Sequence, residues 1–144
     1  MINEKKLIAN VVVELKNLDK AVIKLQESYQ HCKVIGVYDD DVVADALSIR
    51  FARASDIYIQ KILSTLVALL HETTQGFIDK INICDKFYII NNGQELLAIR
   101  DLRNSVNHEY AGNMISKIFN DILEYTPKLL ANIEQTKVYI GNKL

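Results

Sequence analysis

The side chains of this sequence that are best suited to chemistry lie in one stretch, where Arg100, Arg103, Asn104, His108 and Tyr110 crowd together. An imidazole with an unperturbed pKa of about 6.5 can take a proton from a hydroxyl and return one to a leaving oxygen. A guanidinium offers a planar fork of donors to a phosphate and stabilises its developing charge. This chemistry needs no metal. We therefore predict that His108 is the general acid/base, that Arg103 stabilises the phosphate and that Asn104 orients His108 or the phosphate. Arg100 is a secondary candidate for binding substrate.

The spacing of these residues limits how they can meet. At about 100° per residue on a straight helix, Arg103 and His108 point roughly 140° apart, whereas Arg100, Asn104 and His108 form one column. A single helix therefore cannot easily bring Arg103 and His108 to one small substrate. Either the helix unwinds near Asn107, or two copies face each other so that one protomer's arginine meets the other's histidine.

The string Arg103-x4-His108-x-Tyr110, with Asn104 directly after the arginine, resembles the signature of the HEPN superfamily. More narrowly, it is similar to the HepT-like toxins and to the related small helical proteins that partner minimal nucleotidyltransferases. The resemblance implies a metal-independent ribonuclease without a cofactor, in which His108 acts on the ribose 2′-OH and Arg103 holds the phosphate. It also implies a homodimer with a composite site, in agreement with the second of the two routes.

The tyrosine of the motif has a separate role in this family. In HepT-like toxins it is adenylylated by a partner minimal nucleotidyltransferase, which acts as the antitoxin. The resemblance therefore implies that Tyr110 is modified, and that the added AMP blocks RNA by steric overlap and charge repulsion. Considered without the family, Tyr110 is more simply a half-buried tyrosine that packs against its neighbours.

Three functions follow from these alternatives. The first is an endoribonuclease toxin with RNA as its substrate. The second is a non-catalytic substrate-binding subunit of a minimal nucleotidyltransferase. The third is a structural helical dimer, in which Arg103 and His108 only pair with acids such as Asp101 or with the carbonyls at a helix end. The formal net charge of −1 is low for a nucleic-acid binder, so recognition of RNA would need a local basic patch.

Composition narrows the fold and the compartment. The 144 residues fit one domain, and only 5 glycines and 1 proline favour long helices with short connections. Cys32 and Cys84 are far apart and form no CxxC motif, which predicts neither a disulfide framework nor a zinc site. The N-terminal residues lack the apolar core of a signal peptide, and no apolar run is long enough to span a membrane. We therefore expect a cytoplasmic protein.

Apolar periodicity predicts the first helix over residues 4–33. Its stripe has the alternating spacing of three and four residues that is typical of a packed helix face, and it consists of Ile8, Val11, Leu15, Leu18, Val22, Leu25, Tyr29 and Cys32. The stripe either packs inside a bundle or forms the seam of a dimer.

The second predicted helix covers residues 41–72, with the acids at 39–41 at its start. Its apolar stripe comprises Leu47, Phe51, Ala54, Tyr58, Ile62, Thr65 and Leu69. Arg50 and Arg53 lie one turn apart on this helix. Arg53 forms a local ion pair with Asp56, three residues on, or else the two arginines form a basic lip that binds phosphate or supports the later motif.

Three further helices complete the predicted chain. After a loop at residues 71–76, a short helix over 78–90 turns Ile78, Ile81, Phe87 and Ile90 to the core. A fourth helix over 94–108 carries the motif, and Asn92 with Glu95 resembles a capping box at its start. A fifth helix begins near 113, and we expect a kink or a restart at Pro127, with Thr126 as N-cap. The predicted fold is all-α, an up-and-down bundle of about four to five helices in a single HEPN-like domain over residues 1–144.

Overall fold

The computed structural model describes residues 4–35, 41–108 and 114–144, and it contains helices but no strands within these ranges. The helices are α1 (Glu4–Ile35), α2 (Asp41–Asp56), the π-helix η1 (Ile57–Leu63), α3 (Ser64–Leu69), α4 (Phe77–Lys86), α5 (Gly93–His108) and α6 (Met114–Lys143). Because α2, η1 and α3 follow one another without a break, the described chain forms five helical rods. None of its helices is long and apolar enough to cross a membrane.

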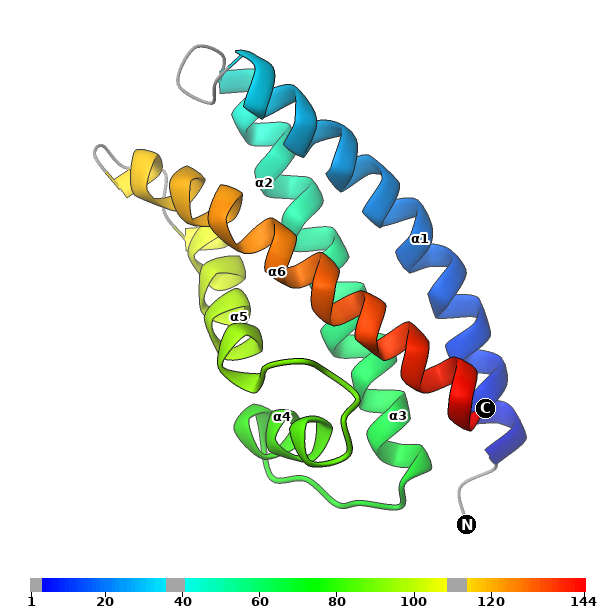
Figure 1. Cartoon of the computed structure of the whole chain (residues 1–144). Helices are drawn as coiled ribbons and strands as arrows, with labels where there is room; N and C mark the ends of the chain where they lie inside the picture. The colour runs from blue at the N-terminus through cyan, green and yellow to red at the C-terminus, as the bar shows by residue number, and fades with distance from the viewer. Residues whose placement is uncertain (1–3, 36–40, 109–113) are drawn as a thin grey trace.

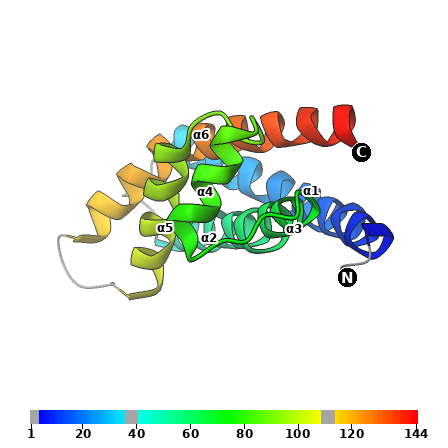
Figure 2. The same ribbon diagram turned by 90° about the horizontal axis from the view of Figure 1, so that it is seen from below.

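The long rods alternate in direction along the chain, and Figure 1 shows α1, α2–α3, α5 and α6 running along the molecule while α4 lies across one end. α1 packs along α2, η1 and α3, whereas α5 packs on α6, α2 and α4. Viewed from below, α4 lies beside α5 (Figure 2). This is the all-α architecture expected from the periodicity, and α4 packs on both α5 and α3.

The predicted stripe of α1 forms part of the core. Val11, Leu18, Leu25 and Cys32 are buried, and the intervening members of the stripe are partly buried against them. Ile8 was expected in the same stripe, but its side chain is 37% exposed. Ile8 has the same heptad position as Leu15, Val22 and Tyr29, which are also only partly buried, so this position lies at the edge of the packed face along the whole helix.

The second rod, formed by α2, η1 and α3, buries the predicted stripe, but part of it is a π-helix that was not predicted. All its members from Leu47 to Thr65 are buried and Leu69 is partly buried. The last helical residue is Leu69, before the predicted end at residue 72, and residues 70–76 form the connection to α4. Within the rod, seven residues form the π-helix η1.

The third predicted helix is shorter than expected. α4 ends at Lys86 because Tyr88 adopts a left-handed conformation, with a φ of 59°. The N–H of Tyr88 then bonds to the carbonyl of Asp85, and that of Ile89 to the carbonyl of Cys84, which is a Schellman termination. Ile81 and Ile90 are buried as predicted, and Phe87 is partly buried.

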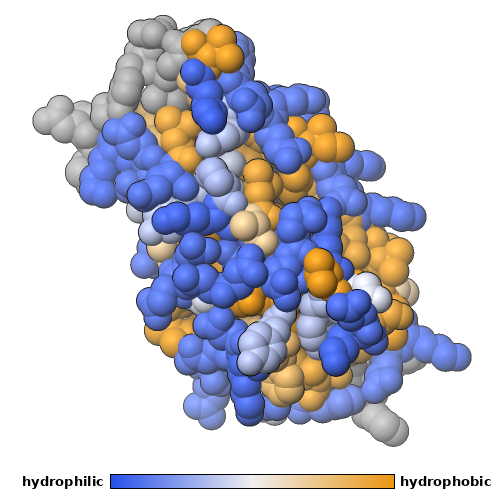
Figure 3. Space-filling model, in the orientation of Figure 1, coloured by the Kyte–Doolittle hydropathy of each residue, from blue (hydrophilic) through white to orange (hydrophobic). Residues whose placement is uncertain are grey.

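The prediction that Ile78 faces the core is wrong, because its side chain is 60% exposed. Ile78 lies in the first turn of α4, at the end of the molecule that this helix crosses (Figure 1). The fully buried residues of α4 lie in its next turns, at Ile81 and Cys84, and Phe77 in the first turn is partly buried against the core. On the face of the molecule drawn in Figure 3, hydrophilic side chains cover most of the surface and apolar ones are scattered between them.

The start of α5 confirms Asn92 as its cap. The side-chain carbonyl of Asn92 accepts hydrogen bonds from the N–H groups of Gln94 (2.9 Å) and Glu95 (3.3 Å). The capping box is not closed in the usual way, because the Glu95 carboxylate accepts a hydrogen bond from the Asn132 side chain instead. Asn92 thus satisfies the first N–H groups of α5, and Glu95 connects this motif-bearing helix to α6.

α6 continues as one helix through Pro127, so the predicted restart with Thr126 as N-cap is wrong. The Thr126 hydroxyl donates back to the Ile122 carbonyl at 2.6 Å, as in a helix interior. A proline inside a helix costs about 3 kcal/mol. The flanking residues Ile122, Leu129 and Ile133 are all buried, and burial of such side chains contributes about 1.5–3 kcal/mol each. Packing therefore outweighs the cost of the proline.

Candidate functional site around Arg103

The central contact of the candidate site joins α5 to the end of α2. Arg103 donates from Nε to one oxygen of Asp56 and from Nη2 to the other, both at 2.6 Å. The two side chains are partly open to solvent, with 25% of Arg103 and 41% of Asp56 exposed. The hydrogen bonds that Arg103 donates to Asp56 raise the pKa of Arg103 above its usual range. Arg103 is therefore a fixed, permanently charged group whose charge is already balanced by one carboxylate.

The arginines of α2 do not join this contact. The predicted ion pair between Arg53 and Asp56 does not form; Asp56 binds Arg103 and Arg53 lies exposed at the surface. Arg50 turns toward α1, where it donates to the Ser28 hydroxyl at 2.7 Å and to the Lys24 carbonyl at 3.3 Å. The structure thus places Arg50 and Arg53 away from the cavity beside Arg103.

This cavity, which we call the Arg103 cavity, has a volume of about 450 Å³ and lies between α1, α5 and the junction of α2 with η1. Arg100, Arg103 and Asn104 line its α5 side, so three predicted site residues share one surface. Lys61 lines the opposite side and was missed from the sequence. The signal was present, because Gln60 and Lys61 interrupt an otherwise apolar run.

The π-helix shapes the wall that carries Lys61. In a π-helix the backbone bonds run from i to i+5, and the resulting bulge is often found at functional sites. The Ile59 carbonyl accepts hydrogen bonds from the Ser64 hydroxyl at 3.4 Å and from Nζ of Lys80 on α4 at 3.2 Å. α4 is in this way attached to η1 just beside the cavity.

One polar atom at the cavity is not satisfied. Ser55 lines the Arg103 cavity and only 1% of the residue is exposed. Its Oγ has no hydrogen-bond partner within the part of the chain that the structure describes. An unsatisfied buried hydroxyl costs about 1–3 kcal/mol. This region is therefore not optimised for stability.

Arg100 lies one turn before Asn104 and makes a different contact from Arg103. Its guanidinium stacks over the Phe77 ring at the start of α4, 4.6 Å from the ring centroid. Arg100 also lines the Arg103 cavity. Arg100 and Asn104, which were predicted to form one column on the helix, thus both line the Arg103 cavity.

The rest of the motif can be followed only along the backbone. α5 remains helical through His108, so the helix does not unwind near Asn107, and the first of the two predicted routes is not used. The side chains of Asn107 and His108, and residues 109–113 with Tyr110, lie outside the described residues. The predicted roles of His108 and Tyr110 accordingly stay predictions.

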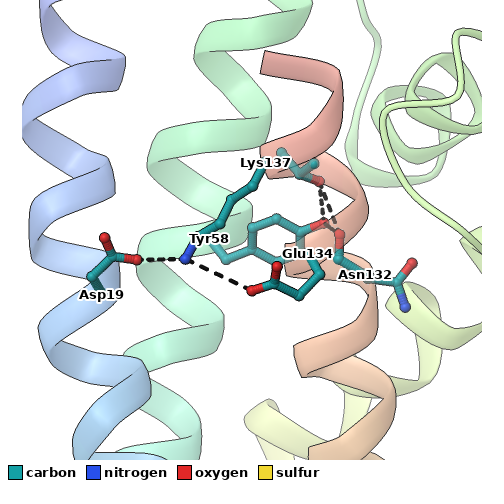
Figure 4. A network of polar contacts seen from close by, with 6 residues as sticks. Asp19, Tyr58, Asn132, Glu134 and Lys137 are labelled. Carbon is teal, nitrogen blue, oxygen red and sulfur yellow. Dashed lines mark hydrogen bonds and ion pairs between the residues drawn. The ribbon is translucent and has the colours of Figure 1, made fainter. Parts of the chain in front are cut away.

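A second polar cluster, which sequence reasoning missed, lies in the core (Figure 4). The Tyr58 hydroxyl is 2.7 Å from Oγ1 of Thr136 and 3.0 Å from the carbonyl of Asn132. Thr136 also donates to the Ile89 carbonyl at 2.7 Å. Burial raises the pKa of Tyr58 above its usual range, so this phenol stays protonated. At the edge of the cluster, Lys137 forms an ion pair with Asp19 at 2.6 Å.

Asn132 is the centre of this cluster, which we call the Asn132 network. Its side-chain oxygen accepts from the N–H groups of Asn91 (2.9 Å) and Asn92 (3.1 Å), and its side-chain nitrogen donates to Glu95 (3.0 Å). Each polar atom of this buried amide is therefore used. The network fixes the loop before α5, and hence the position of the whole motif-bearing helix.

The cysteines lie apart from the site. Cys32 and Cys84 are both buried and free. Burial raises the pKa of each thiol, that of Cys84 to about 12. No group of three or more histidine, cysteine, aspartate or glutamate side chains that could hold a metal occurs within 4–35, 41–108 and 114–144.

Comparison with known proteins leaves the site to be interpreted from its own chemistry, since no family model, no curated protein and no solved structure matches this chain.

Proposed function

We propose that this protein is a metal-independent endoribonuclease, the toxin of a HEPN/minimal-nucleotidyltransferase pair, and that it acts as a homodimer in the cytoplasm. His108 is the general acid/base, Arg103 stabilises the phosphate, and Asn104 orients the histidine or the phosphate. Arg100 contributes to RNA binding. The observation that carries the proposal is that Arg100, Arg103 and Asn104 line one open cavity on the helix whose last residue is His108.

The ion pair with Asp56 is compatible with a phosphate-binding role for Arg103. A guanidinium has five N–H donors, and Asp56 takes one from Nε and one from Nη2. The remaining donors, on Nη1 and Nη2, are left for a phosphate. In the proposed mechanism Asp56 is a positioning residue that holds the guanidinium plane, so less side-chain freedom is lost when substrate binds.

The geometry of α5 favours a site shared between two copies. Because the helix continues through His108, Arg103 and His108 point roughly 140° apart around its axis. A second protomer facing the first would supply the missing partner, the arginine of one copy acting with the histidine of the other. The resemblance of the motif to HepT-like toxins supports the further proposal that the antitoxin nucleotidyltransferase neutralises the protein by adenylylation of Tyr110.

One observation favours the second candidate, a non-catalytic substrate-binding subunit of a minimal nucleotidyltransferase. The charge of Arg103 is already balanced by Asp56, which weakens its attraction for a phosphate relative to an unpaired arginine. In this alternative the cavity would hold the substrate for a partner enzyme.

The test is RNA cleavage by the purified protein in excess EDTA, with His108→Ala and the matched control His31→Ala measured beside it. His31 is an exposed histidine on α1, so its loss should leave cleavage unchanged. We expect the wild type and His31→Ala to cleave and His108→Ala to lose at least about 100-fold, the usual contribution of a general acid/base. Equal cleavage by all three proteins would reject His108 as the catalytic base, and no cleavage on several RNAs would favour the binding subunit.

A further inference from the structure

We propose a second binding site for a phosphate group, adjacent to the Arg103 cavity, in the pocket formed by η1, α3, the start of α4 and Arg100. This pocket, which we call the Lys80 pocket, has a volume of about 300 Å³. Its lining includes Gln60, Ser64, Thr74, Lys80 and Arg100. Its lining shares Gln60 and Arg100 with the Arg103 cavity but does not include Arg103 or Asn104, so phosphate binding here can be tested apart from the cleavage activity proposed above.

Lys80 supplies the first positive charge without a carboxylate partner. Its Nζ donates to the Ser64 hydroxyl at 2.9 Å and to the Ile59 carbonyl at 3.2 Å, and both acceptors are neutral. Burial, together with the nearby charge of Arg100, lowers the pKa of this ammonium. An anion in the pocket would relieve that unfavourable environment, since an opposite charge nearby favours the charged form.

Arg100 supplies the second positive charge. Its guanidinium lies on the Phe77 ring, an arrangement that leaves the N–H groups at the edge of the plane available to an acceptor. No ion pair of Arg100 is formed among the residues that the structure describes. The pocket thus brings together a guanidinium and an ammonium from two different helices.

The two acids of α4, the helix that carries Lys80, are used elsewhere. Asp79 accepts a hydrogen bond from the N–H of Gln75 at 3.0 Å. Asp85 accepts one from the N–H of Gly93 at 3.2 Å. Neither carboxylate lines the Lys80 pocket, in contrast to Asp56 in the Arg103 cavity. The two cations of this pocket are therefore left for an external anion.

The chemistry of the other lining groups points to a phosphate. Thr74 contributes a hydroxyl group, whereas the Ser64 hydroxyl already donates to the Ile59 carbonyl and accepts from Lys80. A phosphate has enough oxygens to accept from an ammonium, a guanidinium and a hydroxyl at once. A carboxylate, with two oxygens, would satisfy fewer of them.

The two cavities are neighbours, because Gln60 and Arg100 line both. A phosphate in the Lys80 pocket can therefore belong to an RNA strand that also passes Arg103, or to a free nucleotide. Both sources present the same phosphate chemistry to Lys80 and Arg100.

The site can be tested by calorimetric titration at low salt with inorganic phosphate, AMP and a short single-stranded RNA as probes. The variants are Lys80→Gln and Arg100→Gln, and the matched control is Lys86→Gln, which changes an exposed lysine of the same helix. We expect saturable binding of phosphate by the wild type and the control, and affinity weakened at least about tenfold in both pocket variants, in line with the loss of one charged contact. Folding of each variant is checked by circular dichroism, and Arg100→Gln serves as the test if Lys80→Gln does not fold.

The outcomes separate the two ligand sources and the two proposals. Displacement of phosphate by RNA would identify a backbone phosphate as the occupant, and displacement by AMP alone would identify a free nucleotide; either supports the site. His108→Ala should keep phosphate binding even where it loses cleavage. The absence of saturable binding of all three probes, or equal binding by Lys80→Gln, Arg100→Gln and Lys86→Gln, would overturn the proposal.

Discussion

The Asn132 network and the Arg103 cavity differ in how their polar atoms are satisfied. In the network, the buried amide of Asn132 and the hydroxyls of Tyr58 and Thr136 all have close hydrogen-bond partners. At the cavity, Ser55 Oγ has none among the described residues, and the Arg103–Asp56 pair is partly open to solvent. Completed buried networks specify a structure, whereas unfinished polar surfaces leave groups free for a ligand.

This difference assigns separate tasks to two regions that are connected through α5. The network fixes the start of the helix through Asn92 and Glu95. The cavity lies against its second half, near Arg103 and Asn104. Substitutions in the network should thus change stability, and substitutions at the cavity should mainly change binding or catalysis.

The largest expected effect comes from breaking the network with Asn132→Ala. The substitution leaves the N–H groups of Asn91 and Asn92 and the carboxylate of Glu95 without their partner. We expect the free energy of unfolding to fall by about 3 kcal/mol. Urea denaturation measures this change, with Asn82→Ala, an exposed asparagine on α4, as a control that should stay within about 0.5 kcal/mol. Equal effects for both variants would mean that the network does not stabilise the fold.

A smaller effect is expected for Asp56→Asn at the cavity. It removes the charge that pairs with Arg103, and because both side chains are partly exposed, we expect a loss of about 1 kcal/mol in unfolding free energy. If Asp56 positions the guanidinium, RNA cleavage should fall while RNA binding stays equal or becomes tighter. The control is Asp121→Asn, in an exposed pair with Lys117, which should cost less than about 0.5 kcal/mol. Faster cleavage by Asp56→Asn would show that Asp56 inhibits instead of positioning.

The smallest effect distinguishes the two regions most directly. Ser55→Ala removes a hydroxyl that has no partner in the described structure, so stability should be unchanged or should rise by up to about 1 kcal/mol. The matched variant is Ser48→Ala, because Ser48 is equally buried and donates to the Ala44 carbonyl at 3.1 Å. Thermal unfolding of both variants measures the difference in stability. If Ser55→Ala were the more destabilising of the two, its hydroxyl would have a partner and the cavity would not be unfinished there.

Much of the fold could be predicted because helices are specified locally. The spacing of Val11, Leu18 and Leu25 places them on one helix face, and Asn92 followed by Glu95 marks a helix start; the structure confirms both. The predicted end of the short helix at residue 90 was wrong, because Tyr88 adopts a left-handed conformation. Such a conformation is typical of glycine, so a tyrosine at this position gives little warning.

The candidate site was predictable in its residue types but not in its contacts. The column of Arg100 and Asn104 on α5 followed from their spacing, which placed Arg103 on another face of the helix. That Arg103 and Lys61 line the same cavity depended on the tertiary arrangement of α1, α2, η1 and α5. The role of Asp56 was also misjudged. It lies three positions after Arg53, yet its carboxylate binds Arg103, 47 positions away.

The sequence by itself determined where the helices lie and which faces they bury, because helical periodicity depends only on neighbours within a few residues. Tertiary structure decided the rest. It kept α6 helical through Pro127, since burial on both sides outweighs one missing hydrogen bond. It also selected Arg103 as the partner of Asp56, because the choice between two arginines depends on which one packing brings within reach in a bidentate geometry.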